Sequence, residues 1–269
     1  MTRIFALALV TFKEGIRSRS LLGVLVFFLF VCGLNLAVAG FFMRDIGKVT
    51  VDMNLGAISF AGLLLVLFLG LNLTTRDIEK KTIQIILSKP ISRTEYAWGK
   101  YLGIQAFLGV ALLVLLVLSS LNILLLRHFY GGFFEGFGWS SFFLAALFIY
   151  LKLSVLNAIV LFFSSLATSS FVTLVLSIGA YIVGTTIEEV LLYLRTELAA
   201  DVASPGSTRF FEFIGHVFPN LAVFDLQLEA AHGLPVSSGQ ILFALGYASA
   251  YIAVMVTLAA LAFSRREFN

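Results

Sequence analysis

The chain has 269 residues, of which 60% are hydrophobic and 12% charged, whereas an ordinary soluble domain has about 45–50% and about 25%. So few ionised side chains cannot cover a 29.4 kDa globule, and the mean hydropathy of +1.02 excludes a water-soluble protein. A formal net charge of +3 gives no basic face for phosphates, which excludes a nucleic-acid binder. The 28 phenylalanines and four prolines predict an all-α integral membrane protein rather than a barrel of short strands.

Residues 2–19 are too polar to span a membrane, but their apolar residues recur with the period of a helix. Ile4, Phe5, Ala8, Leu9, Phe12 and Ile16 share one face. Arg3, Lys13, Glu14 and Arg17 fall on the other face. The pattern predicts an N-terminal amphipathic helix in the membrane interface, with a plain extension of the first span as the alternative.

Six runs that are almost free of charge are long enough to cross a hydrocarbon core of about 30 Å. They are residues 21–43, 56–74, 101–126, 139–163, 171–190 and 240–263. At about 1.5 Å per residue, the first would be ~34 Å long. The small residues at 37–39 resemble a signal-peptide cleavage site, but the apolar run continues to Met43, so we interpret this run as a retained span.

The basic residues outside the spans gather on one side of the predicted topology. If both termini are cytoplasmic, the inner segments carry twelve basic and five acidic residues, and the outer segments carry five basic and ten acidic ones. The positive-inside rule therefore places both termini in the cytoplasm and predicts a multi-pass protein of the cytoplasmic (inner) membrane.

The loop at 75–99 has the signals of a folded element. Thr74 and Asp77 can cap a helix that Pro90 ends, and Ser92 with Glu95 has the form of a capping box before the third span. The pattern predicts a helix-containing docking surface. A solvated connector is the alternative, since basic inner loops are common for topological reasons alone.

Lys152 is the basic residue in the interior of the predicted spans. A lysine at the centre of a membrane costs at least about 2.5–3.5 kcal/mol, so it is a candidate for a substrate path, where it would meet an anionic group. The alternative is a structural lysine that bonds to Ser154 or Asn157.

The segment 191–239 is long and acidic, and prolines divide it into short amphipathic pieces. His128, His216 and His232 all fall outside the membrane in the predicted topology, but their spacing matches no ligand pattern, so no metal site is expected.

The stretch 76–103 resembles the first cytoplasmic loop of the type 2 ABC exporter permeases. The shared features are an acidic-basic run, a threonine, an apolar run, Leu87-x-x-Pro90, Ser92-Arg93 and Gly99-Lys100 before the third span. Phe218-Pro219-Asn220-Leu221, Phe224-Asp225 and the tail from Ser264 extend the resemblance along the chain. Lys81 departs from it, because the family usually has glycine there. The branch that the chain most resembles contains the nitrous-oxide-reductase maturation and gliding-motility permeases.

The resemblance implies a single permease domain over 1–269 that acts as a homodimer with two copies of a separate ABC-type ATPase. The loop at 75–99 would form a coupling helix on the ATPase, through Arg76, Glu79, Ile83, Leu87, Lys89, Pro90 and Arg93. The segment 191–239 would form an outer gate, through Phe210, Phe211, Phe213, Phe218, Pro219 and Phe224. An interfacial cap without a gating role is the alternative for this segment.

The chain itself is expected to be neither an enzyme nor a nucleotide-binding protein. It lacks the Gly-x-x-x-x-Gly-Lys-Ser/Thr motif, so ATP and Mg²⁺ would be bound by the partner ATPase. Membrane lipid and a periplasmic accessory protein are further expected partners. A non-transporting assembly scaffold and an ATP-independent secondary transporter remain alternatives, although the second would leave a folded basic loop without a role.

Overall fold

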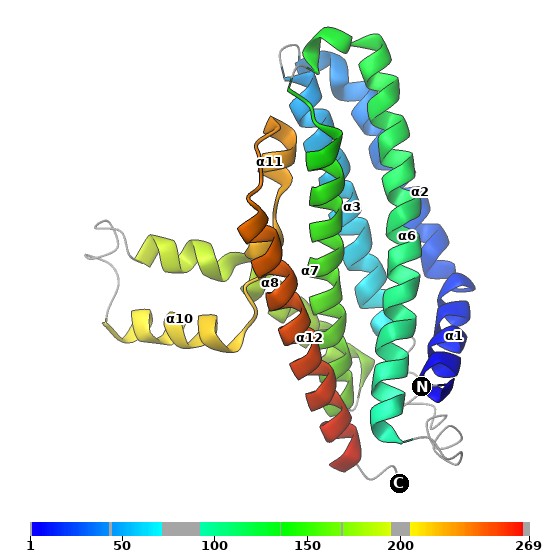
Figure 1. Ribbon diagram of the computed structural model, residues 1–269, viewed down its shortest axis with the longest axis vertical. Helices are drawn as coiled ribbons and strands as arrows, with labels where there is room; N and C mark the ends of the chain where they lie inside the picture. The colour runs from blue at the N-terminus through cyan, green and yellow to red at the C-terminus, as the bar shows by residue number, and fades with distance from the viewer. Residues whose placement is uncertain are drawn as a thin grey trace.

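The computed structural model describes residues 2–42, 45–71, 92–134, 136–167, 169–194 and 205–265. The described part is helical and contains no strand, which confirms the predicted fold class. Most of its long helices run along one axis (Figure 1). The α-helices are α1 (Thr2–Ile16), α2 (Arg19–Val38), α3 (Ile46–Gly70), α6 (Arg93–Phe129), α7 (Trp139–Leu166), α8 (Ser170–Leu194), α10 (Pro205–Val217), α11 (Gln227–His232) and α12 (Ser238–Arg265).

Six of the described helices are long and apolar enough to span a membrane, as the sequence predicts: α2, α3, α6, α7, α8 and α12. Two of them start eight or more residues before the apolar runs that predicted them. α3 begins at Ile46. Its first turns are helical but carry Lys48 and Asp52, so they lie outside the apolar run. α6 begins at Arg93, directly after the cap at Ser92.

The start of α6 is fixed by the predicted capping box. The Ser92 hydroxyl accepts from the Glu95 N–H at 3.2 Å, and the Glu95 carboxylate accepts from the Ser92 N–H at 2.8 Å. Two N–H groups that a helix start would leave without partners are thereby satisfied. The helix cap predicted at Thr74 and Asp77 lies outside the described residues.

The bundle has a centre and a periphery. α3 and α7 are mostly buried, and α7 contacts α3, α6, α8 and α12. α2, α8 and α12 expose most of their apolar surface, as helices that face lipid do. Both chain ends lie at one end of the bundle, here called the terminus end; the opposite end, with the α6–α7 connection, is called the loop end (Figure 1).

Polar side chains connect α2, α3 and α6 inside the bundle. The Asn54 amide donates to Asn122 Oδ1 at 3.1 Å, Ser119 donates to Asn54 Oδ1 at 2.9 Å, and the Asn122 amide donates to the Cys32 carbonyl at 3.2 Å. Because lipid offers no hydrogen bonds, each contact favours helix association by about 0.6–2 kcal/mol.

The N-terminal helix α1 packs along α6. It ends at Ile16 and is therefore separate from α2, which begins at Arg19 (Figure 1). Two glycines permit the close approach: a Cβ on Gly103 would lie 2.6 Å from the Ala8 carbonyl oxygen, and one on Gly99 would lie 2.7 Å from the Leu7 side chain. The buried Lys100 ammonium then reaches Glu14 at 3.7 Å. The interfacial position of α1 stays a prediction.

We expect Gly103→Ala to destabilise the protein, because the new methyl group forces the α1 backbone away from α6. The loss should be about 1–3 kcal/mol, measured as a lower thermal unfolding temperature of the detergent-solubilised protein. The matched control is Gly56→Ala in α3, where a Cβ meets nothing within 4 Å. Equal unfolding temperatures for the two variants would contradict the packing of α1 described above.

Candidate functional site

Lys152 lies near the middle of α7 and is only 5% exposed. The polar residues that follow it on α7 bond to α6 instead: Gln105 donates to the Ser154 hydroxyl, and the Asn157 amide donates to Gln105 Oε1 at 3.4 Å. Lys152 faces α8, where its Nζ lies 5.6 Å from the centre of the Tyr181 ring. An aromatic face stabilises a cation at this distance, by about 0.5–2 kcal/mol, and within the described residues Nζ makes no hydrogen bond to the Tyr181 hydroxyl.

The chain re-enters the bundle between α10 and α11. In residues 218–226, here called the return segment, Pro219, Leu221, Phe224 and Leu226 are buried. The short 3₁₀ turn at Ala222–Phe224 packs on both α7 and α8. The return segment therefore closes the side of the bundle on which Lys152 lies.

Hydrogen bonds attach the return segment to two helices. The Leu221 N–H donates to the Gly184 carbonyl at 2.7 Å, which ties it to α8. The Asn220 N–H donates to the Tyr247 hydroxyl of α12 at 2.9 Å, and the Asn220 amide donates to Glu188 at 2.9 Å. A Cβ on residue 184 would lie 2.7 Å from the Pro219 carbonyl oxygen, so this approach requires glycine at 184.

Asp225 is the next-to-last residue of the return segment; it is exposed and directly follows the 3₁₀ turn that packs on α7 and α8, the helices of Lys152 and Tyr181. Its carboxylate acts electrostatically on both the Lys152 ammonium and Tyr181. The two charges are nevertheless more than 4.0 Å apart, because they form no direct ion pair. Asp225 Oδ1 instead accepts from the Gln227 N–H at 3.2 Å, at the start of α11. Lys152 thus has a counter-charge nearby without a bonded partner.

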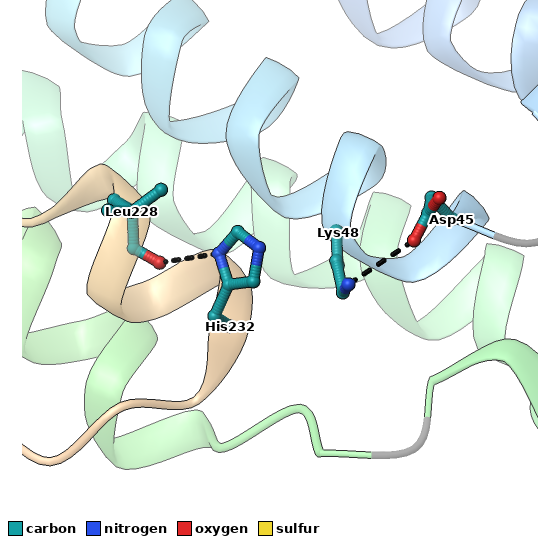
Figure 2. Close-up of polar contacts among 4 residues, drawn as sticks. All are labelled: Asp45, Lys48, Leu228 and His232. Carbon is teal, nitrogen blue, oxygen red and sulfur yellow. Dashed lines mark hydrogen bonds and ion pairs between the residues drawn. The ribbon is translucent and has the colours of Figure 1, made fainter.

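Asp225 also lines a cavity of about 410 Å³ between α3 and α11 toward the loop end. Lys48, Asp52, Gln227 and His232 contribute to its wall. Figure 2 shows His232 on α11 beside α3, with its Nδ1 3.1 Å from the Leu228 carbonyl oxygen, and Lys48 paired with Asp45 at 3.3 Å. The cavity therefore presents charged groups of both signs, and Asp225 belongs both to its wall and to the surroundings of Lys152.

No three His, Cys, Asp or Glu side chains come together as a metal site in the part of the chain that the structure describes. His128 is exposed near the loop-end terminus of α6, and His232 lies on α11. The side chain of His216 lies outside the described residues.

The phenylalanines predicted for an outer gate fall into two groups. Phe218 and Phe224 belong to the return segment with Pro219, and Phe224 is fully buried. Phe210, Phe211 and Phe213 lie on α10, where the first and third are 59% and 67% exposed. α10 packs on α8, and the two helices project sideways from the bundle (Figure 1). The structure therefore does not bring the six residues together as one cluster.

Six of the seven residues predicted to dock an ATPase lie outside the described residues: Arg76, Glu79, Ile83, Leu87, Lys89 and Pro90. The seventh, Arg93, is described. Its guanidinium donates to the carbonyl oxygens of Phe263 and, at 3.1 Å, Ser264, where α12 ends. The Phe263 ring also packs edge-on against Tyr96, with ring centres 5.5 Å apart. Arg93 thus connects the start of α6 to the end of α12.

The sequence interpretation missed Tyr181, Gly184 and Asp225 as parts of the Lys152 site. Asp225 had a usable signal, since a buried lysine needs an acidic residue nearby and Asp225 follows an apolar stretch. No signal in the sequence identifies Tyr181 or Gly184, because tyrosine and glycine are common in apolar helices and their role depends on what packs against them.

Comparison with known families gives one match: the family described as ABC-2 family transporter protein matches residues 5–268. Among curated proteins, none matches the chain significantly.

We expect Arg93→Ala to loosen the last turn of α12, because two carbonyl oxygens lose a charged donor. Backbone hydrogen–deuterium exchange at 259–265 should rise roughly tenfold, as expected for the loss of a hydrogen bond to a charged group. The matched control is Arg265→Ala, which removes an exposed charge from the same helix end. Equal exchange in both variants would contradict the capping role of Arg93.

Proposed function

The chain belongs to the ABC-2 family of transporter proteins and is a multi-pass permease of an ABC transporter, and we propose that it is the permease of an exporter driven by a separate ATPase subunit. The observation that carries the proposal is a family match over nearly the whole chain, 5–268, on a bundle with six helices of spanning length. The given sequence contains no P-loop motif, which supports an energy source on another subunit. The resemblance of the sequence supports the nitrous-oxide-reductase maturation and gliding-motility branch.

The ATPase docks, in this proposal, at the terminus end of the bundle. α3 ends there and α6 begins there, and the sequence between them contains Arg76, Glu79, Ile83, Leu87, Lys89 and Pro90. Both chain ends lie at the same end of the bundle (Figure 1), and the basic excess supports a cytoplasmic position for it. The protein then lies in the cytoplasmic membrane with both termini inside, and ATP and Mg²⁺ bind to the partner.

The contacts at the start of α6 support a route from the ATPase to the bundle. Lys100 pairs with Glu14 of α1, and Arg93 bonds to the end of α12. A push on the segment before α6 would therefore move α1, α6 and α12 together. α12 packs against α7, which carries Lys152, so the movement can bias two packings around the proposed substrate path.

The arm formed by α8 and α10 supports a second copy of the chain as a partner. It projects from the bundle (Figure 1) and exposes Leu192, Tyr193, Phe210, Phe213 and Val217. In a homodimer with two ATPase subunits, this arm would cover apolar surface of the second permease. The phenylalanines of α10 and of the return segment would then close the outer exit, where a periplasmic accessory protein could receive the substrate.

The docking proposal predicts that charge reversal at Glu79 and Arg76 weakens binding of the ATPase. Glu79→Arg and Arg76→Glu should each reduce copurification of the ABC-type ATPase by roughly tenfold, the effect of about 1.4 kcal/mol. The control is Arg127→Glu, which reverses an exposed charge at the loop end of α6. Undiminished copurification and ATP hydrolysis in the first two variants would overturn the docking surface and favour a non-transporting scaffold.

A further inference from the structure

We propose that Lys152 binds an anionic oxygen group of the transported substrate, such as a phosphate, and that this group replaces the more distant carboxylate of Asp225 as the counter-charge of Lys152. The arriving anion displaces Asp225 and releases the return segment. This inference rests on the proposed function as a permease, and it adds the substrate class and the group that senses the substrate.

The first step of the argument is the incomplete partnership of Lys152. Lys152 is buried, being only 5% exposed, and it lies near the middle of the spanning helix α7. Within the described residues, its ammonium makes no hydrogen bond and no ion pair within 4.0 Å. An ammonium group has three N–H donors, so this position keeps room for the oxygens of a ligand.

The second step concerns the sign of the ligand. The Tyr181 ring lies 5.6 Å from Nζ, and an aromatic face attracts a cation at this distance. A cationic group would be repelled by this ammonium, whereas an anionic oxygen would complete its hydrogen bonds and neutralise its charge. The site therefore favours anions.

The third step concerns Asp225. Asp225 directly follows the 3₁₀ turn that packs on α7 and α8, and its carboxylate accepts from the Gln227 N–H at the start of α11 instead of reaching Lys152. An anion at Lys152 would repel this carboxylate. Because Asp225 belongs to the return segment, its displacement loosens this segment from α7 and α8.

The fourth step concerns the direction of release. Asp225 forms part of the wall of the 410 Å³ cavity that Lys48 and His232 also line. Displacement of Asp225 would open the surroundings of Lys152 toward this cavity, which lies toward the loop end. Substrate binding at Lys152 would thus open the route by which the substrate leaves toward the loop end.

The test measures whether the return segment becomes accessible. Ala222→Cys places a thiol in the 3₁₀ turn. The native Cys32 is buried, and labelling of the parent protein, which carries Cys32 alone, gives the background rate. The permease alone is reconstituted in phosphatidylcholine nanodiscs, and the rate of labelling by a membrane-impermeant maleimide is measured. On this background, Lys152→Met and Asp225→Asn should each speed labelling roughly two- to tenfold, and the double variant should add little, since the two residues are coupled.

Controls separate this effect from a general loss of charge or of folding. Lys13→Met and Glu189→Gln remove exposed charges of each sign and should leave the labelling rate unchanged. Asp225→Asn keeps the side-chain oxygen that accepts from Gln227. Unfolding temperatures equal to that of the parent show that the variants are folded; additive effects of the two substitutions, or none, would overturn the coupling of Lys152 to Asp225.

The anion itself is tested with two probes on the Ala222→Cys protein. Phosphatidylglycerol in the nanodisc tests a lipid headgroup, and inorganic phosphate in the buffer tests a free anion. At least one should speed labelling, and the effect should vanish with Lys152→Met. No effect of either probe, or an equal effect with Lys152→Met, would overturn the proposal. Since the ATPase is absent from this experiment, such a result leaves the docking proposal untouched.

Discussion

The hydrocarbon core of a membrane offers no hydrogen bonds, so a polar group inside this bundle is stabilised by a partner within the protein. The cluster of Asn54, Ser119 and Asn122 meets this demand by bonding α2, α3 and α6 to one another. Gln105 does the same between α6 and α7. Lys152 differs from these groups, because its ammonium has an aromatic face and a distant carboxylate instead of a bonded acceptor. That difference makes Lys152 the centre of the functional proposal.

The two ends of the molecule are connected through a small number of contacts. At the terminus end, Arg93 and Lys100 attach the start of α6 to α12 and α1. α12 runs past α7, and its Tyr247 hydroxyl accepts from Asn220 of the return segment. In the proposed mechanism, a displacement of α6 by an ATPase would be transmitted to the return segment through α12. Because coupled sites act on each other reciprocally, anion binding at Lys152 would also affect the terminus end through the same contact.

The sequence predicts the architecture well, because hydropathy and helix caps are local properties. Six apolar runs identify the spanning helices, and Ser92 with Glu95 identifies the start of α6. The polar starts of helices are harder to find: the first turns of α3 carry Lys48 and Asp52 and do not look like a span. The sequence also identifies Lys152, since a charge in an apolar run stands out.

The partners of these residues depend on tertiary packing and are not visible in the sequence. Asp225 is 73 positions from Lys152 and approaches it because the return segment folds back between α7 and α8. Gly184 matters because the Pro219 carbonyl comes close to it, which no local pattern encodes. Arg93 was predicted to face an ATPase from its place beside the loop, whereas its guanidinium bonds to the end of α12. Its part in docking stays a proposal, and the structure gives it a connecting role within the bundle.

The central claim is that this chain works as the membrane half of an ATP-driven transporter. The most direct test is native mass spectrometry of the chain, purified from its own membrane in mild detergent with whatever subunits accompany it. The account predicts a complex of two copies of this chain and two copies of a P-loop ATPase of the ABC type, which dissociates when residues 75–91 are replaced by a flexible linker. A chain that is consistently isolated without an ATPase, or a complex that survives this replacement, would contradict it.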